Sequence, residues 1–124
     1  AWARLKPKTN RFLLYDVNTN EVDVLGEGVL TRDGHCSYSP DRKWVLLDTY
    51  PDRNHNQNLY LYRPVDGKRV DLGNFYLSPD FRHKPWRCDL HPRWSRDGTQ
   101  VCIDSAHEST RQMYVLDLSG HVRS

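Results

Sequence analysis

The chain has 124 residues, of which 37% are hydrophobic and 27% charged, and its net charge is +2. This length is enough for one hydrophobic core, and no apolar run is long enough to cross a bilayer. The nearly balanced charge argues against nucleic acid and membrane as partners. The three cysteines are odd in number and follow no zinc-ribbon spacing, so we expect no disulfide framework.

Short strands joined by polar turns are expected along the whole chain. Residues 11–26 predict two strands around a polar turn, and residues 35–73 predict four. Within the second unit, WVLLD is a continuous apolar run typical of a buried strand, whereas NLYLYR alternates. The third unit, residues 91–117, predicts three strands. The four strands of the second unit are expected at residues 35–38, 44–48, 58–63 and 68–73.

An internal repeat relates the second and third units. HCSYSPDRKWVLLDT (35–49) aligns with HPRWSRDGTQVCIDS (91–105) without a gap, at an offset of 56 residues. Repeats of about 40–60 residues built from short strands are typical of propeller blades. The residues that are identical at this offset are His35 and His91, Ser39 and Ser95, Asp41 and Asp97, Val45 and Val101, and Asp48 and Asp104.

The predicted fold class is therefore all-β, a fragment of a β-propeller with about two and a half four-stranded antiparallel blades. With the strands of a blade named a to d outward from the axis, residues 11–26 supply c–d of one blade. Residues 35–73 form a complete blade, and residues 91–117 supply a–b–c of the next. Residues 11–26 also match residues 58–73 of the second unit, so the chain holds three copies of one unit. A two-sheet sandwich is the alternative, although three copies fit it poorly.

SPDRKWVLL and SRDGTQVCI resemble the S-x-D-G-x-x-hydrophobic turn of the TolB-like propellers, which are relatives of the WD-repeat proteins. The resemblance extends over nearly the whole chain. It implies a fold more than a function, since such propellers include both binding scaffolds and enzymes. Arg42 occupies the position where the turn has glycine, so we expect the first of the two turns to differ locally.

A narrower resemblance is to the oligogalacturonate lyase branch of these propellers. Members bind a divalent metal near the axis through a His-x-His pair in one blade and a single His in another. The resemblance implies that His35 is the single ligand and that Asp89 and His91 form the pair, with Asp in place of the first His. Carboxylate and imidazole both suit Mn²⁺, so the expected cofactor is a divalent metal such as Mn²⁺.

The repeat gives a separate reason for these residues to converge. His35 and His91 begin equivalent innermost strands of adjacent blades, and Asp89 would share the side of His91 if the chain were extended there. Other interpretations stay open. His35 could instead bond backbone groups at the strand start, and Cys36 and Cys88 could join a mixed Cys/His zinc site.

The remaining acidic residues have structural interpretations. Asp41 and Asp97 are expected to form turns, and Asp48 and Asp104 to bond loop amides.

One basic and aromatic cluster, RHKPWRC (82–88), is a candidate substrate-binding segment. Trp86 could stack on a sugar ring, while Arg82, Lys84 and Arg87 could pair with uronate carboxylates. A solvated loop whose Trp86 covers the neighbouring blade is an equally good interpretation.

Two functions follow from these observations. The first is a polysaccharide lyase that performs metal-assisted β-elimination on uronate-containing oligosaccharides, so that its partner is an acidic oligosaccharide. The resemblance implies a catalytic base from an earlier blade, and we assign no base in this chain. The second is a non-catalytic propeller that binds a protein or glycan on the same face.

Overall fold

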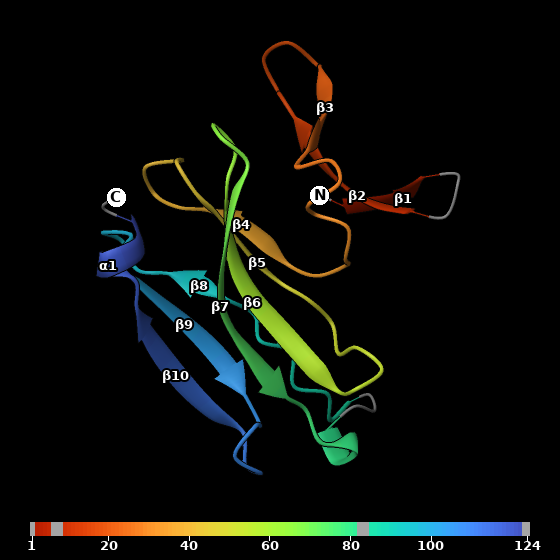
Figure 1. Cartoon of the computed structure of the whole chain (residues 1–124), viewed down its shortest axis with the longest axis vertical. Coiled ribbons are helices and arrows are strands. Elements are labelled where there is room, and N and C mark those ends of the chain that lie inside the picture. The colour runs from red at the N-terminus through yellow and green to blue at the C-terminus, as the bar shows by residue number, and fades with distance from the viewer. Residues whose placement is uncertain (1, 6–8, 82–84, 123–124) are drawn as a thin grey trace.

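The computed structural model describes residues 2–5, 9–81 and 85–122, and the predicted all-β fold class is confirmed (Figure 1). Three antiparallel sheets follow one another along the chain. The first contains β1 (Trp2–Leu5), β2 (Thr9–Tyr15) and β3 (Val22–Leu25). The central sheet contains β4 (Cys36–Tyr38), β5 (Val45–Asp48), β6 (Asn56–Arg63) and β7 (Lys68–Tyr76). The third contains β8 (Arg93–Trp94), β9 (Gln100–Ser105) and β10 (Gln112–Asp117).

The central sheet has the strand order β4-β5-β6-β7, in which each strand pairs with its neighbour along the chain. Its outer pair is longer than the sequence indicates, because β6 and β7 stay paired from Arg63 and Lys68 as far as Asn56 and Tyr76. A register shift between Leu59 and Tyr60 absorbs one extra residue of β7. The strands therefore extend further toward the end of the sheet where β5 connects to β6.

Two other strands differ from the expectation. The strand β1, which pairs with β2, was not predicted from the sequence. The strand β8 begins at Arg93 rather than at His91, and it pairs with β9 through only two residues. The candidate ligands Asp89 and His91 therefore lie in a loop that leads into the innermost strand of the third sheet.

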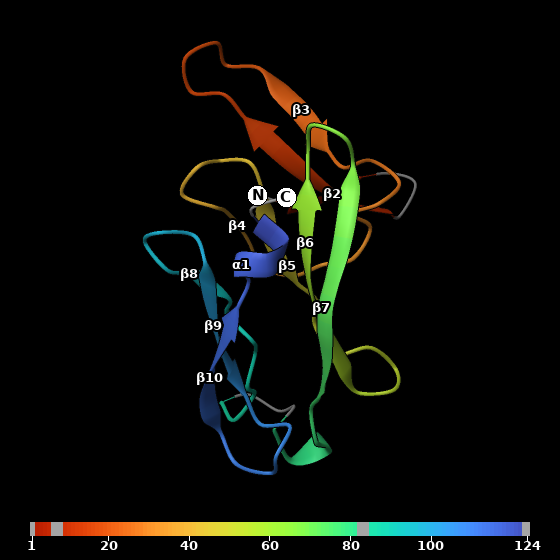
Figure 2. The ribbon, with the colours of Figure 1, turned by 60° about the vertical axis from the view of Figure 1, so that its left-hand side comes forward.

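The hydrophobic core lies on both faces of the central sheet. Figure 2 shows the third sheet lying beside the central one. All four residues of β5 are buried, which explains its continuous apolar run. Towards the third sheet, Leu46 and Leu61 join a cluster with Val101 and Ile103. Towards the first sheet, the cluster consists of Phe12, Leu30, Val45, Leu47, Tyr60 and Tyr62.

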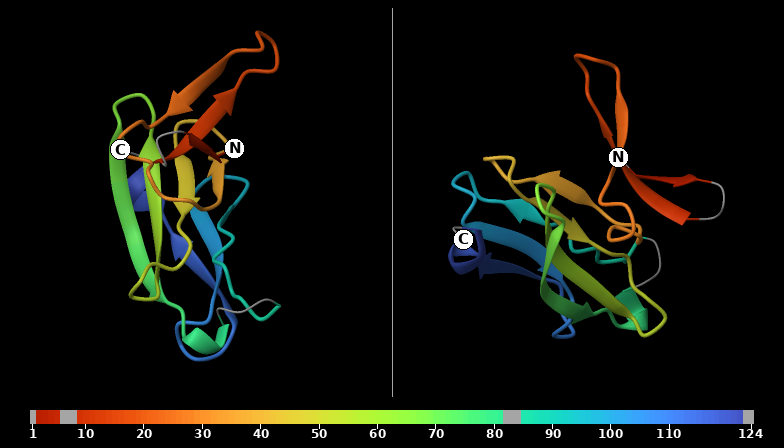
Figure 3. Two further views of the ribbon diagram at one scale, coloured as in Figure 1. Left: turned by 90° about the vertical axis from the view of Figure 1, so that its right-hand side faces the viewer. Right: turned by 45° about the horizontal axis from the view of Figure 1, so that its top comes forward.

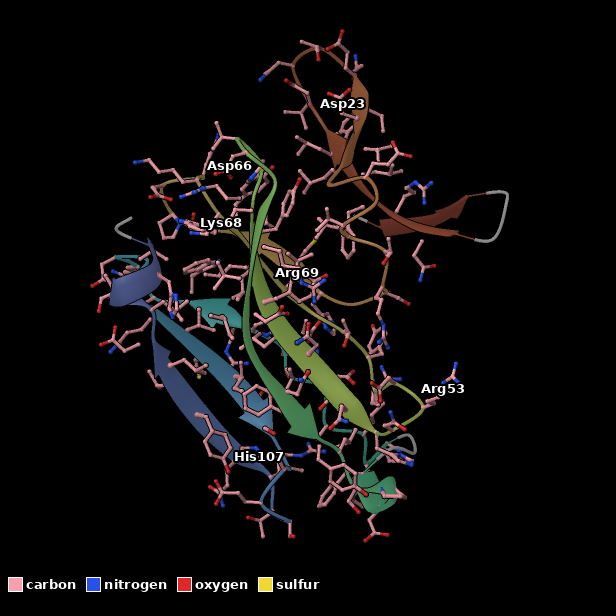
Figure 4. The ribbon with its side chains drawn as sticks, in the orientation of Figure 1. Asp23, Arg53, Asp66, Lys68, Arg69 and His107 are labelled. Atoms are coloured by element: carbon pink, nitrogen blue, oxygen red, sulfur yellow. The ribbon has the colours of Figure 1, made fainter. Side chains whose placement is uncertain are left out.

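The connections between strands divide between two ends of the molecule (Figure 4). Arg53, between β5 and β6, and His107, between β9 and β10, lie towards the lower end in that view. Asp66 and Lys68, at the turn from β6 to β7, lie towards the upper end. Figure 3 shows that the first sheet is set off from the other two, which lie side by side.

The turn between β4 and β5 closely matches the turn between β8 and β9. Asp41 accepts hydrogen bonds from the hydroxyl of Ser39 (2.6 Å) and the amide of Lys43 (3.0 Å). Asp97 accepts the corresponding bonds from Ser95 (2.7 Å) and Thr99 (3.0 Å), so both aspartates form turns as predicted.

Arg42 does not change its turn, contrary to the expectation. It adopts a left-handed backbone with φ of 60°, and the equivalent Gly98 has φ of 72°. The turn geometry is therefore conserved between the two copies, and the side chain of Arg42 is accommodated at a conformational cost.

Among the described residues, helical structure is limited to short segments. A 3₁₀ turn spans Pro79–Phe81, and the helix α1 spans Ser119–Val122. In the part of the chain that the structure describes, no helix has the length and apolar character needed to cross a membrane.

Replacing Arg42 with glycine is expected to stabilise the protein. A left-handed backbone costs a residue with a Cβ about 1–2 kcal/mol, and the greater freedom of unfolded glycine offsets part of the gain. We expect Arg42→Gly to raise the free energy of unfolding by about 0.5–1 kcal/mol, measured by chemical denaturation. The matched control, Gly98→Ala, should lower it, because it adds a Cβ to the same conformation.

Candidate metal centre

His35 lies immediately before β4 and is fixed by the carboxylate of Asp48 at the end of β5. The backbone amide of His35 donates to Asp48 Oδ1 at 2.6 Å, and its Nδ1 lies 3.2 and 3.1 Å from the two carboxylate oxygens. Because a carboxylate accepts hydrogen bonds, Nδ1 is the donor in this contact, and in a neutral ring the lone pair is then on Nε2. The side chain of Asp48 is only 2% exposed, whereas that of His35 is 34% exposed.

Gly34 makes this contact possible. A Cβ at this position would overlap the carbonyl oxygen of Asp48 and lie 2.7 Å from its carbonyl carbon and 2.8 Å from its Oδ1. Cβ atoms in protein structures essentially never lie within 3.0 Å of such atoms. The absence of a side chain at Gly34 therefore lets Asp48 approach the start of β4.

His91 lies beside His35, as the repeat predicts. The centres of the two rings are 4.4 Å apart, and their planes are inclined by 36°. His91 is exposed, and its Nδ1 lies 3.4 Å from the carbonyl oxygen of Asp89, which leaves Nε2 available. Its φ is 43°, so the expectation of an extended chain from Asp89 is wrong at this residue. The left-handed backbone turns the ring of His91 back towards His35.

Asp89 supplies the carboxylate of the cluster. Its Oδ2 accepts a hydrogen bond from Arg87 at 2.8 Å, and its side chain is 11% exposed. Its Oδ1 is buried and has no hydrogen-bond partner among the residues that the structure describes. Burying a carboxylate oxygen without a partner is unfavourable, so this atom has the capacity to bind a cation.

Together these three residues form a cluster with metal-ligand geometry. Each of His35, Asp89 and His91 offers one ligand atom, and the three atoms lie within 4.8 Å of one another. Two ligands at about 2.0–2.2 Å from one ion are about 3.4 Å apart at a tetrahedral angle, so the three side chains would have to draw closer together to bind one ion. Two imidazoles and one carboxylate suit Zn²⁺ or Mn²⁺, and they leave coordination positions for water or substrate.

Two further residues lie beside the cluster: Tyr50, which the sequence did not point to, and Arg87, which was predicted to bind substrate. Tyr50 follows β5, and its ring lies edge-on to that of His35, with the two ring centres 5.6 Å apart. The guanidinium carbon of Arg87 lies 4.7 Å from the centre of the Tyr50 ring. Burial raises the pKa of Tyr50, and the negative charges of Asp33 and Asp89 raise it further. The sequence signal for this contact was the position of Tyr50 in a loop that lies at the same end of the molecule as His35.

The other candidate ligands have different surroundings. Cys88 is buried, and burial raises the pKa of its thiol, which opposes the thiolate form that binds zinc. Asp104, the repeat equivalent of Asp48, forms an ion pair with Arg93 at 3.0 Å instead of contacting His91. The mixed cysteine and histidine site therefore lacks support among the described residues, whose metal-ligand cluster contains no cysteine.

The predicted substrate-binding segment is described only in part, because Arg82 and Lys84 lie outside the described residues. Trp86 is 68% exposed. It lines a shallow concavity together with Asp80, Phe81, Pro85 and Arg111. Arg111 donates to the carbonyl oxygens of Trp86 (2.9 Å) and Arg87 (3.2 Å), which holds this segment against the third sheet. Arg87 is engaged by Asp89 and stacked on Tyr50, so it supports the cluster.

Comparison with known proteins bears on the fold. No protein-family model and no curated protein matches the chain. Among solved structures, the crystal structure of TolB from Acinetobacter baumannii is similar, with a TM-score of 0.65 and 20% sequence identity. The match covers 89% of this chain and 24% of that chain, so this chain spans about a quarter of that protein's length. At this identity the likeness establishes only the fold, which corresponds to part of the TolB propeller.

Substitution of Gly34 tests the close approach of Asp48. Gly34→Ala is expected to lower the free energy of unfolding by about 2–3 kcal/mol, because the new Cβ must displace the backbone of Asp48. Thermal or chemical unfolding measures the change. Gly120→Ala is the control, since a Cβ there meets no atom within 4 Å. Equal stability of the two variants would contradict the packing described for Gly34.

Proposed function

We propose that the cluster of His35, Asp89 and His91 binds a divalent metal, with Mn²⁺ as the first candidate, and that the chain is part of a propeller that cleaves uronate-containing oligosaccharides by β-elimination. The observation that carries the proposal is the convergence of three ligand atoms within 4.8 Å. The unpartnered Oδ1 of Asp89 supports it further, because that oxygen has an unused capacity for a cation. The resemblance to the oligogalacturonate lyases supplies the reaction class.

The chain's own residues prepare this chemistry in specific ways. A bound divalent ion would neutralise a uronate carboxylate and so acidify the neighbouring carbon-bound proton. Asp48 holds the ring of His35, and Arg87 holds Asp89 while lying over Tyr50. These contacts keep the ligand atoms in place before any ion binds, which reduces the cost of ordering them.

The surface beside the cluster fits a sugar. Trp86 lies three residues before Asp89, so the Cα atoms of the two residues are at most about 11 Å apart. Its exposed ring offers a flat apolar surface, and Arg111 in the same concavity adds a positive charge. An oligosaccharide with a carboxylate at the metal could therefore place a neighbouring ring on Trp86.

The second candidate function is a binding propeller without catalysis. The ion pair between Arg87 and Asp89 at 2.8 Å favours it, because a guanidinium already balances the charge of the carboxylate. In this case the two histidines would serve the fold, and the exposed Trp86 would contact a protein or glycan partner.

Metal analysis separates the two functions. In the full protein that contains this chain, we expect about one equivalent of Mn²⁺ or Zn²⁺ per chain, and His35→Ala or His91→Ala should weaken binding about 100-fold or more. Calorimetric titration of the metal-free protein measures the affinity. His121→Ala is the matched control, because His121 lies in α1, outside the cluster. A wild-type protein that binds neither ion would rule out the metal centre.

Replacement of Trp86 tests the sugar surface. Trp86→Ala is expected to weaken binding of a uronate oligosaccharide about tenfold, which corresponds to about 1.4 kcal/mol, through loss of stacking. Trp86→Phe should retain most of the affinity. The measurement is an oligosaccharide titration of the full protein, and metal affinity in the same variants should stay unchanged. Equal oligosaccharide affinity for Trp86→Ala and wild type would remove Trp86 from the substrate-binding surface.

A further inference from the structure

We infer that Asp48 is the positioning residue of the metal centre, selecting the His35 tautomer whose Nε2 lone pair faces Asp89 and His91. The inference rests on the proposed metal centre, and it assigns to Asp48 a role that sequence analysis did not give it. Asp48 was expected to bond loop amides, and it does accept the amide of His35 at 2.6 Å. The same carboxylate also lies within hydrogen-bond distance of the ring nitrogen.

Burial makes this contact selective. The side chain of Asp48 is 2% exposed, so water competes little for its oxygens, and the partners shown for it both come from His35. Both oxygens lie at similar distances from Nδ1, 3.2 and 3.1 Å, which places the ring nitrogen between them. A ring held in this way can rotate little, and the nitrogen that donates to Asp48 is not available to bind a metal.

The third sheet provides an internal comparison. Asp104 occupies the repeat position of Asp48, but Leu90 occupies the position of Gly34. The side chain of Leu90 is fully buried in the core, and the amide of Asp104 donates to its carbonyl oxygen at 2.8 Å. The carboxylate of Asp104 is then directed to Arg93, at 3.0 and 3.2 Å.

The two aspartates are therefore identical in the repeat and different in role. In the central unit, which has Gly34, the carboxylate of Asp48 contacts His35. In the third unit, which has Leu90, the carboxylate of Asp104 contacts Arg93 instead of a histidine. His91 accordingly has only a 3.4 Å contact to the carbonyl oxygen of Asp89 at its Nδ1. The centre thus has one firmly oriented histidine, His35, and one exposed histidine whose ring is held more weakly.

The alternative is that Asp48 serves stability alone, by capping the amide of His35. Asp48→Asn separates the two roles, because asparagine can still accept that amide through Oδ1. Its NH₂ group would face Nδ1 and favour the tautomer that is protonated on Nε2, which cannot bind a metal through Nε2. Asp104→Asn is the matched control, since Asp104 is the repeat equivalent with no contact to either histidine ring among the interactions described.

The test uses the full protein containing this chain, with Mn²⁺ and Zn²⁺ as probes. We expect Asp48→Asn to weaken metal binding about 10–100-fold, with Asp104→Asn close to wild type and with similar unfolding temperatures for all metal-free proteins. In parallel, ¹⁵N NMR of labelled histidine should show His35 protonated on Nδ1 in the metal-free wild type and on Nε2 in Asp48→Asn.

The outcomes distinguish this inference from the proposed function. If the wild type binds neither ion, the metal centre itself fails. If the wild type binds an ion and Asp48→Asn binds it equally well, the metal centre stands and the role of Asp48 is overturned. If Asp48→Asn does not fold, the wild-type spectrum decides, because His35 protonated on Nε2 would contradict the inference without any variant.

Discussion

The burial of β5 and β6, the middle strands of the central sheet, is the constraint on which the rest of the structure depends. Because Leu46 and Leu61 pack against the third sheet, the inner strands β4 and β8 are held beside each other. The indole of Trp94 donates to the carbonyl oxygen of Ser37 at 3.3 Å, which links these two strands directly. The residues that precede the two strands must then be neighbours, and the ring contact between His35 and His91 follows from the packing of the sheets.

The ungapped repeat made much of this predictable. Identical residues at an offset of 56 placed His35 and His91 at equivalent strand starts, and equivalent positions in packed sheets lie close together. Turn chemistry was equally readable, because the Ser-x-Asp pattern bonds only nearby groups in the chain. The fold class and the proximity of the two histidines could thus be predicted from local pattern and repetition alone.

Other features could not be read from the repeat, because they depend on where the two copies differ. His35, the repeat equivalent of His91, does not share its left-handed backbone, and Arg87, which pairs with Asp89, aligns with Thr31. The close approach of Asp48 depends on a glycine that is leucine in the other copy. Pattern matching finds what repeated units share, such as the two histidines, whereas the orientation of these side chains depends on positions where the units have diverged.

Arg87 shows how such a site can be stable with and without an ion. A carboxylate that is 11% exposed needs a charged or hydrogen-bonding partner, and Arg87 provides one to Oδ2 of Asp89. This arrangement leaves Oδ1 for a cation, since a carboxylate can accept from two sides. The guanidinium of Arg87 also lies over the ring of Tyr50, and that ring contacts His35. Tyr50 therefore links the residue that holds Asp89 to His35. The arrangement of the three side chains is therefore maintained by the protein's own contacts, which would reduce the cost of ordering them around an ion in the proposed centre.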